Sequence, residues 1–323
     1  MLPENVKETL KKQHYAIVGK NEHSAVQICR WTKKSLTDSG FCYKEKFYGI
    51  KSHLCCQMSP AVMWCPNKCL HCWRAVELTV GSELKGKIDS PNEIIDGCIK
   101  AQRKLITGFK GDKKTNQKKF REAQEPMQFA ISLSGEPSVY EKIGELIEEL
   151  RKRGKTSFLV TNGLYPEKLA ELEKKNQLPT QLYISVNAPG RETYEKIHRS
   201  SKKDAWERLN KSLKIMSELN GKTRTIFRMN LILDLNMISP EKYAEMIKKA
   251  NPLFVELKAF MSVGFARQRI EYRKMPFHKD IVEFSKKILE FLPGYKVLDE
   301  KTESRVVLLG KDKKRMKIKK REI

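Results

Sequence analysis

The residues Cys65-Pro-Asn-Lys-Cys69-Leu-His-Cys72 decide how the rest of the chain is interpreted. Three thiolates at this spacing on one short loop can bind a cubic iron–sulfur cluster and leave its fourth iron open to a substrate or cofactor. A structural zinc site would normally close with a fourth protein ligand from a second C-x-x-C pair, and only Cys98 follows Cys72. The loop therefore predicts a [4Fe-4S] cluster with one open coordination position.

The spacing of these cysteines resembles the signature of the radical S-adenosylmethionine (SAM) enzymes. The resemblance implies that Cys65, Cys69 and Cys72 hold the cluster that reductively cleaves SAM. A motif this short also arises by chance, so the remaining sequence has to support it. His71 departs from the family pattern, which usually has an aromatic residue near the adenine at this position, although an imidazole can also stack.

Length and cysteine use limit the class of protein. A chain of 323 residues can bury one large core, and a single barrel with additions fits this length better than two equal domains. Seven of the eight cysteines fall between Cys29 and Cys72, and the N-terminus builds no apolar leader. We therefore expect a cytoplasmic protein whose reduced thiols bind metal or clusters. No run of about 18 apolar residues occurs, so no membrane span is expected.

The net charge of +25 predicts a polyanionic partner, and nucleic acid is the usual one in the cytosol. The alternative is a lysine-rich chain whose lysines solvate every face. Basic residues do gather in three places, which favours the first interpretation. These are Lys110, Lys113, Lys114, Lys118, Lys119 and Arg121; Arg267, Arg269, Arg273 and Lys274; and the tail 311–320.

Strands and helices alternate after the first sixty residues. Strands are predicted over 61–64, 129–133, 157–160, 182–186, 225–232 and 254–257. Helices are predicted over 91–106, 139–152, 166–174, 192–198, 205–219 and 240–250. Cys98 is interpreted as a small buried residue of the first helix. Six such steps imply a parallel sheet in an α/β partial TIM barrel, (β/α)6, with its chemistry at the carboxyl ends of the strands.

Three regions follow from this pattern. Residues 1–60 form a helical N-terminal extension that carries further cysteines, with helices around 6–15 and 25–31. Residues 61–292 form the barrel, including a last helix over 277–292. Residues 293–323 hold short strands near 295–298 and 305–309, able to seal an edge of the sheet, and a basic tail.

Polar side chains follow the predicted strands. They are Ser134, Gly135 and Glu136; Thr161 and Asn162; Ser185 and Asn187; and Arg228. The first group looks like the Gly-Gly-Glu element that radical SAM enzymes place on the methionine amino group, and the others offer hydroxyls and amides for a ribose or carboxylate. Each has a plainer interpretation, such as turn chemistry or an Arg228–Glu256 pair. Their joint placement favours a SAM site.

Cys29, Cys42 and Cys55 form a second triplet, each thirteen residues from the next. Three thiolates without an obvious fourth ligand suggest a second [4Fe-4S] cluster with an open iron. The alternative is that two of them are buried apolar residues, and Cys56 beside Cys55 shows that not every cysteine here is needed as a ligand.

The flanks of both triplets resemble the archaeal 4-demethylwyosine synthases, radical SAM enzymes of tRNA wybutosine synthesis. The similarity runs from about Leu10 to Leu309. It is carried by the segments 42–50, 53–55, 64–65, 69–74, 131–137 and 255–258.

This resemblance implies a reaction. Such enzymes, which are of the lyase type, condense N1-methylguanosine next to the anticodon of tRNA(Phe) with two carbons of pyruvate, using SAM, two [4Fe-4S] clusters and an external electron donor. Cys29, Cys42 and Cys55 would hold the second cluster, whose open iron would chelate pyruvate. Lys44 would form a Schiff base with pyruvate, and Lys46 is the alternative. We expect a monomer whose basic loops, with Lys113, Lys114, Lys118 and Lys119, bind tRNA phosphates.

Two other functions fit parts of the sequence. One is a radical SAM maturase of a peptide or cofactor with an auxiliary cluster, which would show no salt-sensitive tRNA binding. The other is a zinc-stabilised nucleic-acid-binding protein without catalysis, which would be colourless rather than brown.

Overall fold

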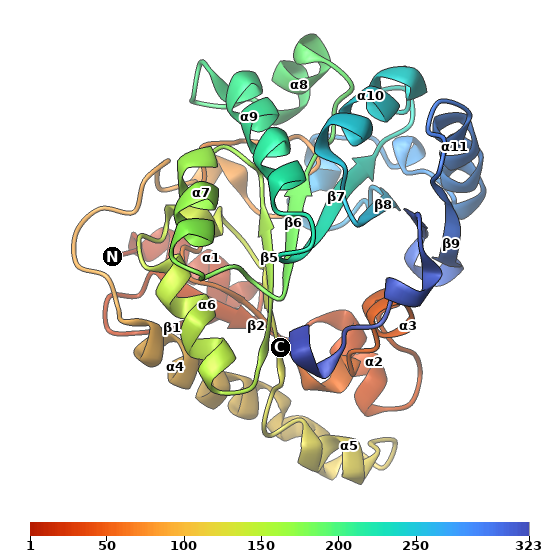
Figure 1. Ribbon diagram of the computed structural model, residues 1–323. Coiled ribbons are helices and arrows are strands. Elements are labelled where there is room, and N and C mark those ends of the chain that lie inside the picture. The colour runs from red at the N-terminus through yellow and green to blue at the C-terminus, as the bar shows by residue number, and fades with distance from the viewer. Residues whose placement is uncertain (323) are drawn as a thin grey trace.

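One ten-stranded sheet organises residues 1–322, the part of the chain that the computed structural model describes. Its strand order is β1-β2-β3-β4-β5-β6-β7-β8-β10-β9 (Figure 1). The six strands from β3 to β8 pair in parallel, whereas β1, β2, β9 and β10 pair antiparallel at the two edges. The strands are β1 Ala16–Val18, β2 Ser24–Gln27, β3 Cys55–Ser59, β4 Gln128–Ile131, β5 Thr156–Thr161, β6 Gln181–Ser185, β7 Arg224–Leu231, β8 Phe254–Ala259, β9 Lys296–Lys301 and β10 Val306–Gly310.

Helices follow the parallel strands, and most of them cover the outer side of the curved sheet, whereas α5 lies apart from the sheet at the bottom of the view (Figure 1). They are α4 Pro91–Ile106, α5 Gln117–Glu122, α6 Ile143–Lys152, α7 Pro166–Lys174, α8 Arg191–His198, α9 Ala205–Glu218, α10 Pro240–Ala250 and α11 His278–Glu290. Three more precede them: α1 Glu4–Lys12, α2 Arg30–Leu36 and α3 Tyr43–Tyr48. Within residues 1–322 no helix has the length and apolar character that crossing a membrane requires.

Local chemistry sets where several helices begin. The Ser90 hydroxyl accepts the Glu93 amide of α4 while the Glu93 carboxylate accepts the Ser90 amide, which satisfies two free N–H groups of the first turn. Both α7 and α10 begin at a proline, whose fixed φ suits the first helical position. Cys98 is fully buried on the inner face of α4, as predicted.

The partial barrel with six parallel strands is confirmed, but the prediction of its first strand is wrong. That strand is β3, Cys55–Ser59, and residues 61–64 form a turn after it. The apolar run 61–64 is buried because it belongs to the main hydrophobic core, directly before the loop of Cys65, Cys69 and Cys72. Met63 adopts a φ of 71°, which no strand allows. The sheet therefore begins before the predicted domain boundary at residue 60.

The N-terminal extension is only partly helical, which also differs from the prediction. Residues 24–27 form the strand β2 rather than the start of a helix, and α2 begins at Arg30. β2 pairs with β3, so the extension contributes three strands to the common sheet. The predicted edge strands near 295–298 and 305–309 are confirmed as β9 and β10, and β10 pairs with β8.

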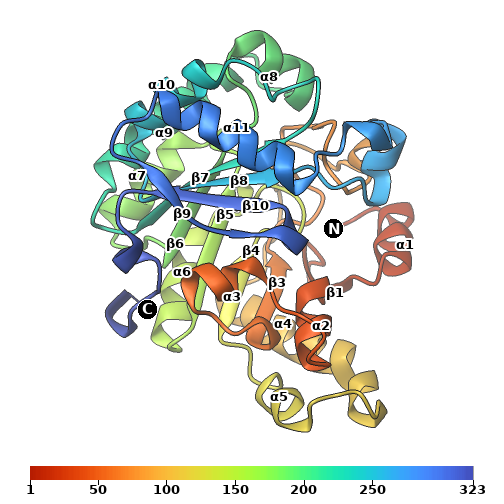
Figure 2. The ribbon, with the colours of Figure 1, turned by 90° about the vertical axis from the view of Figure 1, so that its right-hand side faces the viewer.

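Helix α3 packs on the inner face of the sheet. Its Tyr43, Phe47 and Tyr48 join a buried cluster with Phe158 of β5 and Tyr183 of β6. The helix also lies against β9 (Figure 2). A segment from the N-terminal extension thus fills part of the barrel, and its side chains face the ends of strands far away in sequence.

Candidate active site

The loop with Cys65, Cys69 and Cys72 is fixed from two sides. The amides of Lys68 and Leu70 donate to backbone carbonyls at the end of α8, at 3.0 and 2.9 Å. On the other side Arg269 donates to the carbonyls of Leu70, Cys72 and Arg74. Arg269, predicted to belong to a nucleic-acid-binding surface, thus holds the cluster loop in place.

Each thiol of the first triplet has an N–H or imidazole group beside it. The Asn67 amide lies 3.4 Å from the Cys65 sulfur, and the Arg74 Nε lies 3.2 Å from the Cys72 sulfur. His198 Nδ1 lies 3.3 Å from the Cys69 sulfur. Burial raises the pKa of the Cys65 and Cys69 thiols, whereas the Arg74 guanidinium lowers both. Hydrogen bonds to sulfur and a nearby positive charge favour thiolate ligands.

Several polar atoms around this loop are buried without a partner. They are Asn67 Oδ1, His71 Nδ1, Arg74 Nη1, Tyr194 Oη and His198 Nε2. Buried polar groups are nearly always paired, so such a concentration indicates that a bound polar group belongs there. The three soft thiols and this polar surround fit an iron–sulfur cluster with SAM. Among residues 1–322, no three Cys, His, Asp or Glu side chains surround a position for a single metal ion.

Glu136, after β4, lies against the carboxyl end of the next strand, β5. The Glu136 carboxylate is buried and accepts the Thr161 hydroxyl at 2.7 Å and the Asn162 amide at 2.8 Å. Burial raises its pKa, and these donors oppose the shift. The Asn162 amide group reaches 3.9 Å from the Cys65 sulfur. The structure thus gathers the first two predicted groups beside the first triplet, with Ser134 close to Met63.

Gly135 brings this strand end into contact with the cluster loop. Its φ is +75°, and a Cβ there would run into the Ala61 carbonyl oxygen and lie 2.8 Å from that of Trp64. The amide of Glu136 donates to the same Trp64 carbonyl at 2.7 Å. Only glycine permits both this conformation and this approach.

The carboxyl end of β6 also reaches the loop of the first triplet, at His71. Asn187 is buried, and its Oδ1 accepts the Asn230 amide at 2.8 Å while its Nδ2 lies 3.4 Å from His71 Nε2. Ser185 ends β6 and pairs in register with Arg228 of β7. The side chain of Arg228 does not join these groups but lies with the residues around the second triplet, as described below.

Cys29, Cys42 and Cys55 come together from three elements. Cys29 precedes α2, Cys42 precedes α3, and Cys55 begins β3. Burial raises the pKa of Cys42 to about 12 and also raises that of Cys55; Cys29 adds to both shifts, and Lys44 opposes them. The three half-buried cysteines thus lie near one another and near one lysine, a donor set that suits a second cluster.

Lys44 and Lys46 have very different surroundings although both lie on α3. Lys44 is buried, with its ammonium 4.5 Å from the ring centroid of Tyr183 and 5.0 Å from that of Phe158. Burial lowers its pKa, and Arg228 lowers it further. Lys46 points outward and pairs with Asp299 of β9 at 2.7 Å. Only Lys44 faces the barrel interior beside the thiols.

A buried carboxylate that the sequence analysis did not assign to the site connects these elements. Glu256 of β8 accepts the hydroxyl of Tyr43 at 2.9 Å and that of Tyr48 at 2.5 Å. Both tyrosines lie on α3, on either side of Lys44. Lys258 follows on the same strand, where burial, together with Arg228, lowers its pKa to about 8. The segment 255–258 belonged to the family resemblance, which was the available signal for these two residues.

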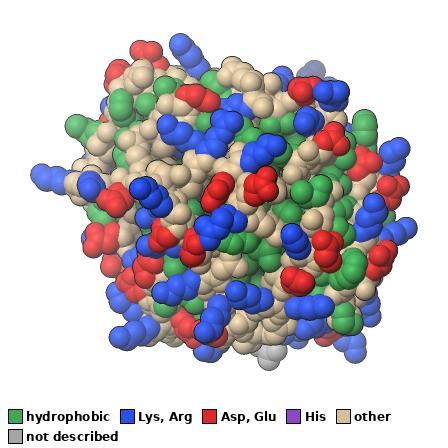
Figure 3. All heavy atoms as spheres, turned by 90° about the horizontal axis from the view of Figure 1, so that it is seen from above, with side chains coloured by type: hydrophobic (Ala, Val, Ile, Leu, Met, Phe, Trp, Pro, Cys, Tyr) green, Lys and Arg blue, Asp and Glu red, His purple; other side chains and the backbone are tan. Residues whose placement is uncertain are grey.

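Lysine and arginine side chains are spread over the face at the carboxyl ends of the strands and alternate there with acidic and hydrophobic groups (Figure 3). Lys110, Lys113 and Lys114 before α5 and Lys118 on α5 are exposed, whereas Lys119 of α5 pairs with Asp38 at 2.6 Å. This segment leads into β4 and thus lies toward the amino-terminal ends of the strands (Figure 1). On the loop after β8, Arg267 and Arg273 are exposed.

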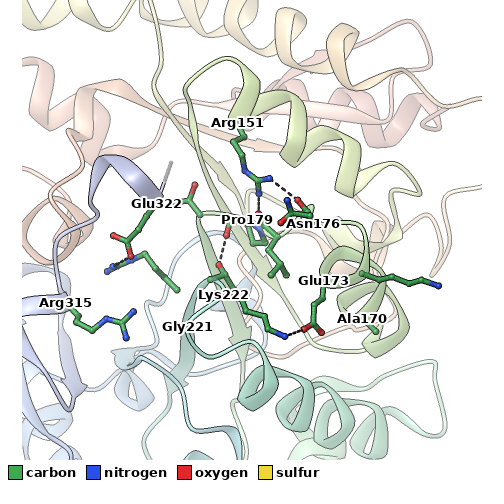
Figure 4. A pocket seen from close by; sticks show the side chains of 14 residues that line it. Arg151, Ala170, Glu173, Asn176, Pro179, Gly221, Lys222, Arg315 and Glu322 are labelled. Atoms are coloured by element: carbon green, nitrogen blue, oxygen red, sulfur yellow. Dashed lines mark hydrogen bonds and ion pairs between the residues drawn. The ribbon is translucent and has the colours of Figure 1, made fainter.

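A cavity of about 1030 Å³ lies at the opposite, amino-terminal end of β6 and β7 (Figure 4). Two ion pairs lie within its lining, Lys222 with Glu173 and Arg224 with Glu322 at 3.2 Å, and Arg151 donates to the carbonyls of Asn176 and Leu178. It contains none of the cysteines, so its size does not make it the site of the chemistry.

Two family models together match most of the chain. The Radical SAM superfamily matches residues 60–247, and Wyosine base formation matches residues 249–311. The boundary between them falls just before β8, which carries Glu256 and Lys258.

Relatives and solved structures agree with these matches. The tRNA 4-demethylwyosine synthase of Pyrococcus abyssi is 51% identical over 96% of this chain and 90% of its own, and that of Methanocaldococcus jannaschii is 36% identical over 98% and 99%. A structure of TYW1 with a lysine-pyruvate adduct bound superposes with a TM-score of 0.86, at 36% identity and 99% coverage of both chains. An archaeal TYW1 structure gives 0.77, at 34% identity over 96% of this chain and 97% of its own. The chain therefore belongs to the family of S-adenosyl-L-methionine-dependent tRNA 4-demethylwyosine synthases.

Proposed function

We propose that this protein condenses N1-methylguanosine of tRNA(Phe) with two carbons of pyruvate to give 4-demethylwyosine, using SAM and two [4Fe-4S] clusters. The observation that carries the proposal is Lys44, a buried amine inside the barrel beside Cys42 and Cys55 that pairs with no acceptor among residues 1–322. Such an amine suits carbonyl chemistry, and the lysine-pyruvate adduct of the related TYW1 supports this assignment.

The first triplet, Cys65, Cys69 and Cys72, would hold a [4Fe-4S] cluster, which would supply the electron that cleaves SAM. The residues nearby position the cofactor. Hydrogen bonds from Thr161 and Asn162 fix the Glu136 carboxylate. This strand end therefore presents its polar groups in a fixed position to the methionine part of SAM. Asn187 holds His71 at the other side of the loop.

Lys44 holds the three-carbon substrate. Its neutral amine adds to the keto carbon of pyruvate, and loss of the keto oxygen as water leaves a carbon–nitrogen double bond to the side chain. The Phe158 and Tyr183 rings lie 5.0 and 4.5 Å from the Lys44 ammonium and limit the positions that this side chain can take. Cys29, Cys42 and Cys55 hold the second cluster next to this position.

Exposed lysines at Lys113, Lys114 and Lys118 contact the tRNA backbone, and the target base is turned out of its stack to enter the barrel. An external protein donates the electron, and the enzyme acts as a monomer.

The decisive experiment is anaerobic reconstitution followed by incubation with methylguanosine-bearing tRNA, SAM and pyruvate. Mass spectrometry of the digested tRNA should show the tricyclic base. SAM cleavage without that base, and without salt-sensitive tRNA binding, would instead support a maturase.

A further inference from the structure

Arg228 has a guanidinium without a partner in the wall of the barrel. It lies on β7, in register with Ser185 of β6 and Glu256 of β8. Its guanidinium carbon is 5.9 Å from the ring centroid of Tyr183. Within residues 1–322 no hydrogen bond or ion pair engages its side chain, although the residue is mostly enclosed. The planar fork of N–H donors is therefore available to an acceptor on a bound molecule.

Lys44 approaches the same ring as Arg228. Its ammonium lies 4.5 Å from the Tyr183 ring centroid. The distance between the two cationic groups therefore cannot exceed the sum of their distances to this centroid. Lys44 likewise makes no hydrogen bond or ion pair to a described residue. The structure thus places an amine and a guanidinium, both without polar partners, around one aromatic ring.

The nearest carboxylate does not neutralise this pair by direct contact. Both oxygens of Glu256 already accept tyrosine hydroxyls from α3. Lys258 adds a third basic group nearby, and its ammonium donates to the Ser304 carbonyl. One carboxylate therefore faces three basic groups, an arrangement that attracts an anion.

We propose that Arg228 binds the carboxylate of the 2-oxo acid whose keto carbon reacts with Lys44. A guanidinium matches the two oxygens of a carboxylate through two parallel hydrogen bonds. In pyruvate the keto carbon is bonded directly to the carboxyl carbon, so one molecule spans two neighbouring cations. The inference rests on the proposed function. It assigns Arg228 to the three-carbon substrate, whereas the sequence predicted a role in binding SAM.

The test measures how much pyruvate is needed to modify Lys44. Reconstituted protein is incubated with increasing pyruvate and cyanoborohydride, and the reduced adduct is quantified by peptide mass spectrometry. Because hydrogen bonds to a charged group are among the stronger ones, R228Q should raise the half-saturating pyruvate concentration about 10- to 100-fold. Hydroxyacetone, a three-carbon ketone without a carboxylate, should label wild type and R228Q equally.

R224Q is the matched control. Arg224 is a buried arginine on the same strand, but its donors are already used by Gln181, the Met316 carbonyl and Glu322. It should leave the half-saturating pyruvate concentration unchanged. SAM cleavage, measured as 5′-deoxyadenosine without pyruvate, should also persist in R228Q.

Several results would overturn the proposal. One is an unchanged pyruvate requirement in R228Q; another is a higher SAM requirement with normal pyruvate labelling, which would restore Arg228 to the SAM site. Should R228Q fail to assemble its clusters, R228K is the second variant, because it retains the charge without the planar fork. Its half-saturating pyruvate concentration should lie between those of wild type and R228Q. Wild type must in any case prefer pyruvate over hydroxyacetone at least tenfold. Equal labelling by the two ketones also refutes it. Wild-type labelling at a residue other than Lys44 would refute the lysine assignment of the proposed function as well.

Discussion

Replacing Gly135 by alanine tests how tightly the SAM side of the barrel is joined to the cluster loop. The residue has a φ of +75°, and an added Cβ would collide with the Ala61 carbonyl oxygen and stand 2.8 Å from that of Trp64. Both carbonyls belong to the turn that leads into Cys65. The substitution must therefore push that turn away from Glu136 or distort the strand end itself.

Two free-energy costs, one conformational and one from packing, add in this variant. A left-handed conformation costs a residue other than glycine about 1–2 kcal/mol. Inserting a methyl group into a packed site costs a further amount of about 1–3 kcal/mol. G135A should thus lower the free energy of unfolding by about 2–5 kcal/mol.

Gly154 provides the matched control. It has a similar φ of +65° after α6, but a Cβ there meets nothing within 4 Å. G154A should carry only the conformational cost, about 1–2 kcal/mol. The difference between the variants isolates the contact with the cluster loop.

The assay is anaerobic urea unfolding of both variants, combined with SAM binding to the reconstituted proteins. G135A should bind SAM more weakly, whereas G154A should bind it normally. Equal losses of stability in the two variants, with unchanged SAM affinity, would show that Gly135 does not couple the strand end to the cluster loop.

Three further predictions follow from the site. C69A should abolish cleavage of SAM, whereas C42A should preserve it and stop formation of the modified base; normal product from C42A, measured by nucleoside mass spectrometry, would exclude the second cluster from the reaction. K44A should lose the pyruvate adduct trapped by cyanoborohydride and K46A should retain it, with peptide mapping as the readout; the reverse result would move the role to Lys46. Burial lowers the pKa of His23, whose ring lies 2.7 Å from the Pro60 carbonyl and 3.4 Å from the Asp89 carboxylate. The unfolded chain therefore takes up a proton that the folded one resists, and the free energy of unfolding should fall as the pH drops below about 6.5. H23Q should flatten this decline in pH-dependent unfolding, and an identical profile in the variant would show that His23 is not its source.

Local signals in the sequence predicted much of the barrel. The helices α7 and α10 begin and end at the predicted residues because a proline marks the start of each and apolar residues recur at helical spacing. The run 61–64 was misleading, since it is apolar without being a strand. A short buried turn and a short buried strand have the same composition, so periodicity cannot separate them.

The first triplet and its neighbours were predictable because their ligands lie close together in sequence. Cys65, Cys69 and Cys72 share one loop, and Glu136 follows a recognisable glycine. The partners of α3 were not predictable in this way. Tyr48 and Glu256 are 208 residues apart, and only the pairing of β8 within the sheet brings them together. The direction of the Arg228 side chain depends likewise on the register of β7 between two neighbours.

The hydrogen bonds from α3 to Glu256 also set an order of events during synthesis. Tyr43 leaves the ribosome 213 residues before its acceptor, an interval of about 10–40 s at ordinary rates of translation. Until β8 has been made, α3 can pack against Phe158 and Tyr183 but its tyrosines lack their carboxylate acceptor. The site around Cys29, Cys42 and Cys55 is therefore incomplete, and their thiols are more open to oxygen and to competing metals. Contacts this distant in sequence form late in folding. The proposed loading of iron and sulfide into the second triplet would therefore follow completion of the chain, and oxidative damage to newly made protein should begin at these three cysteines.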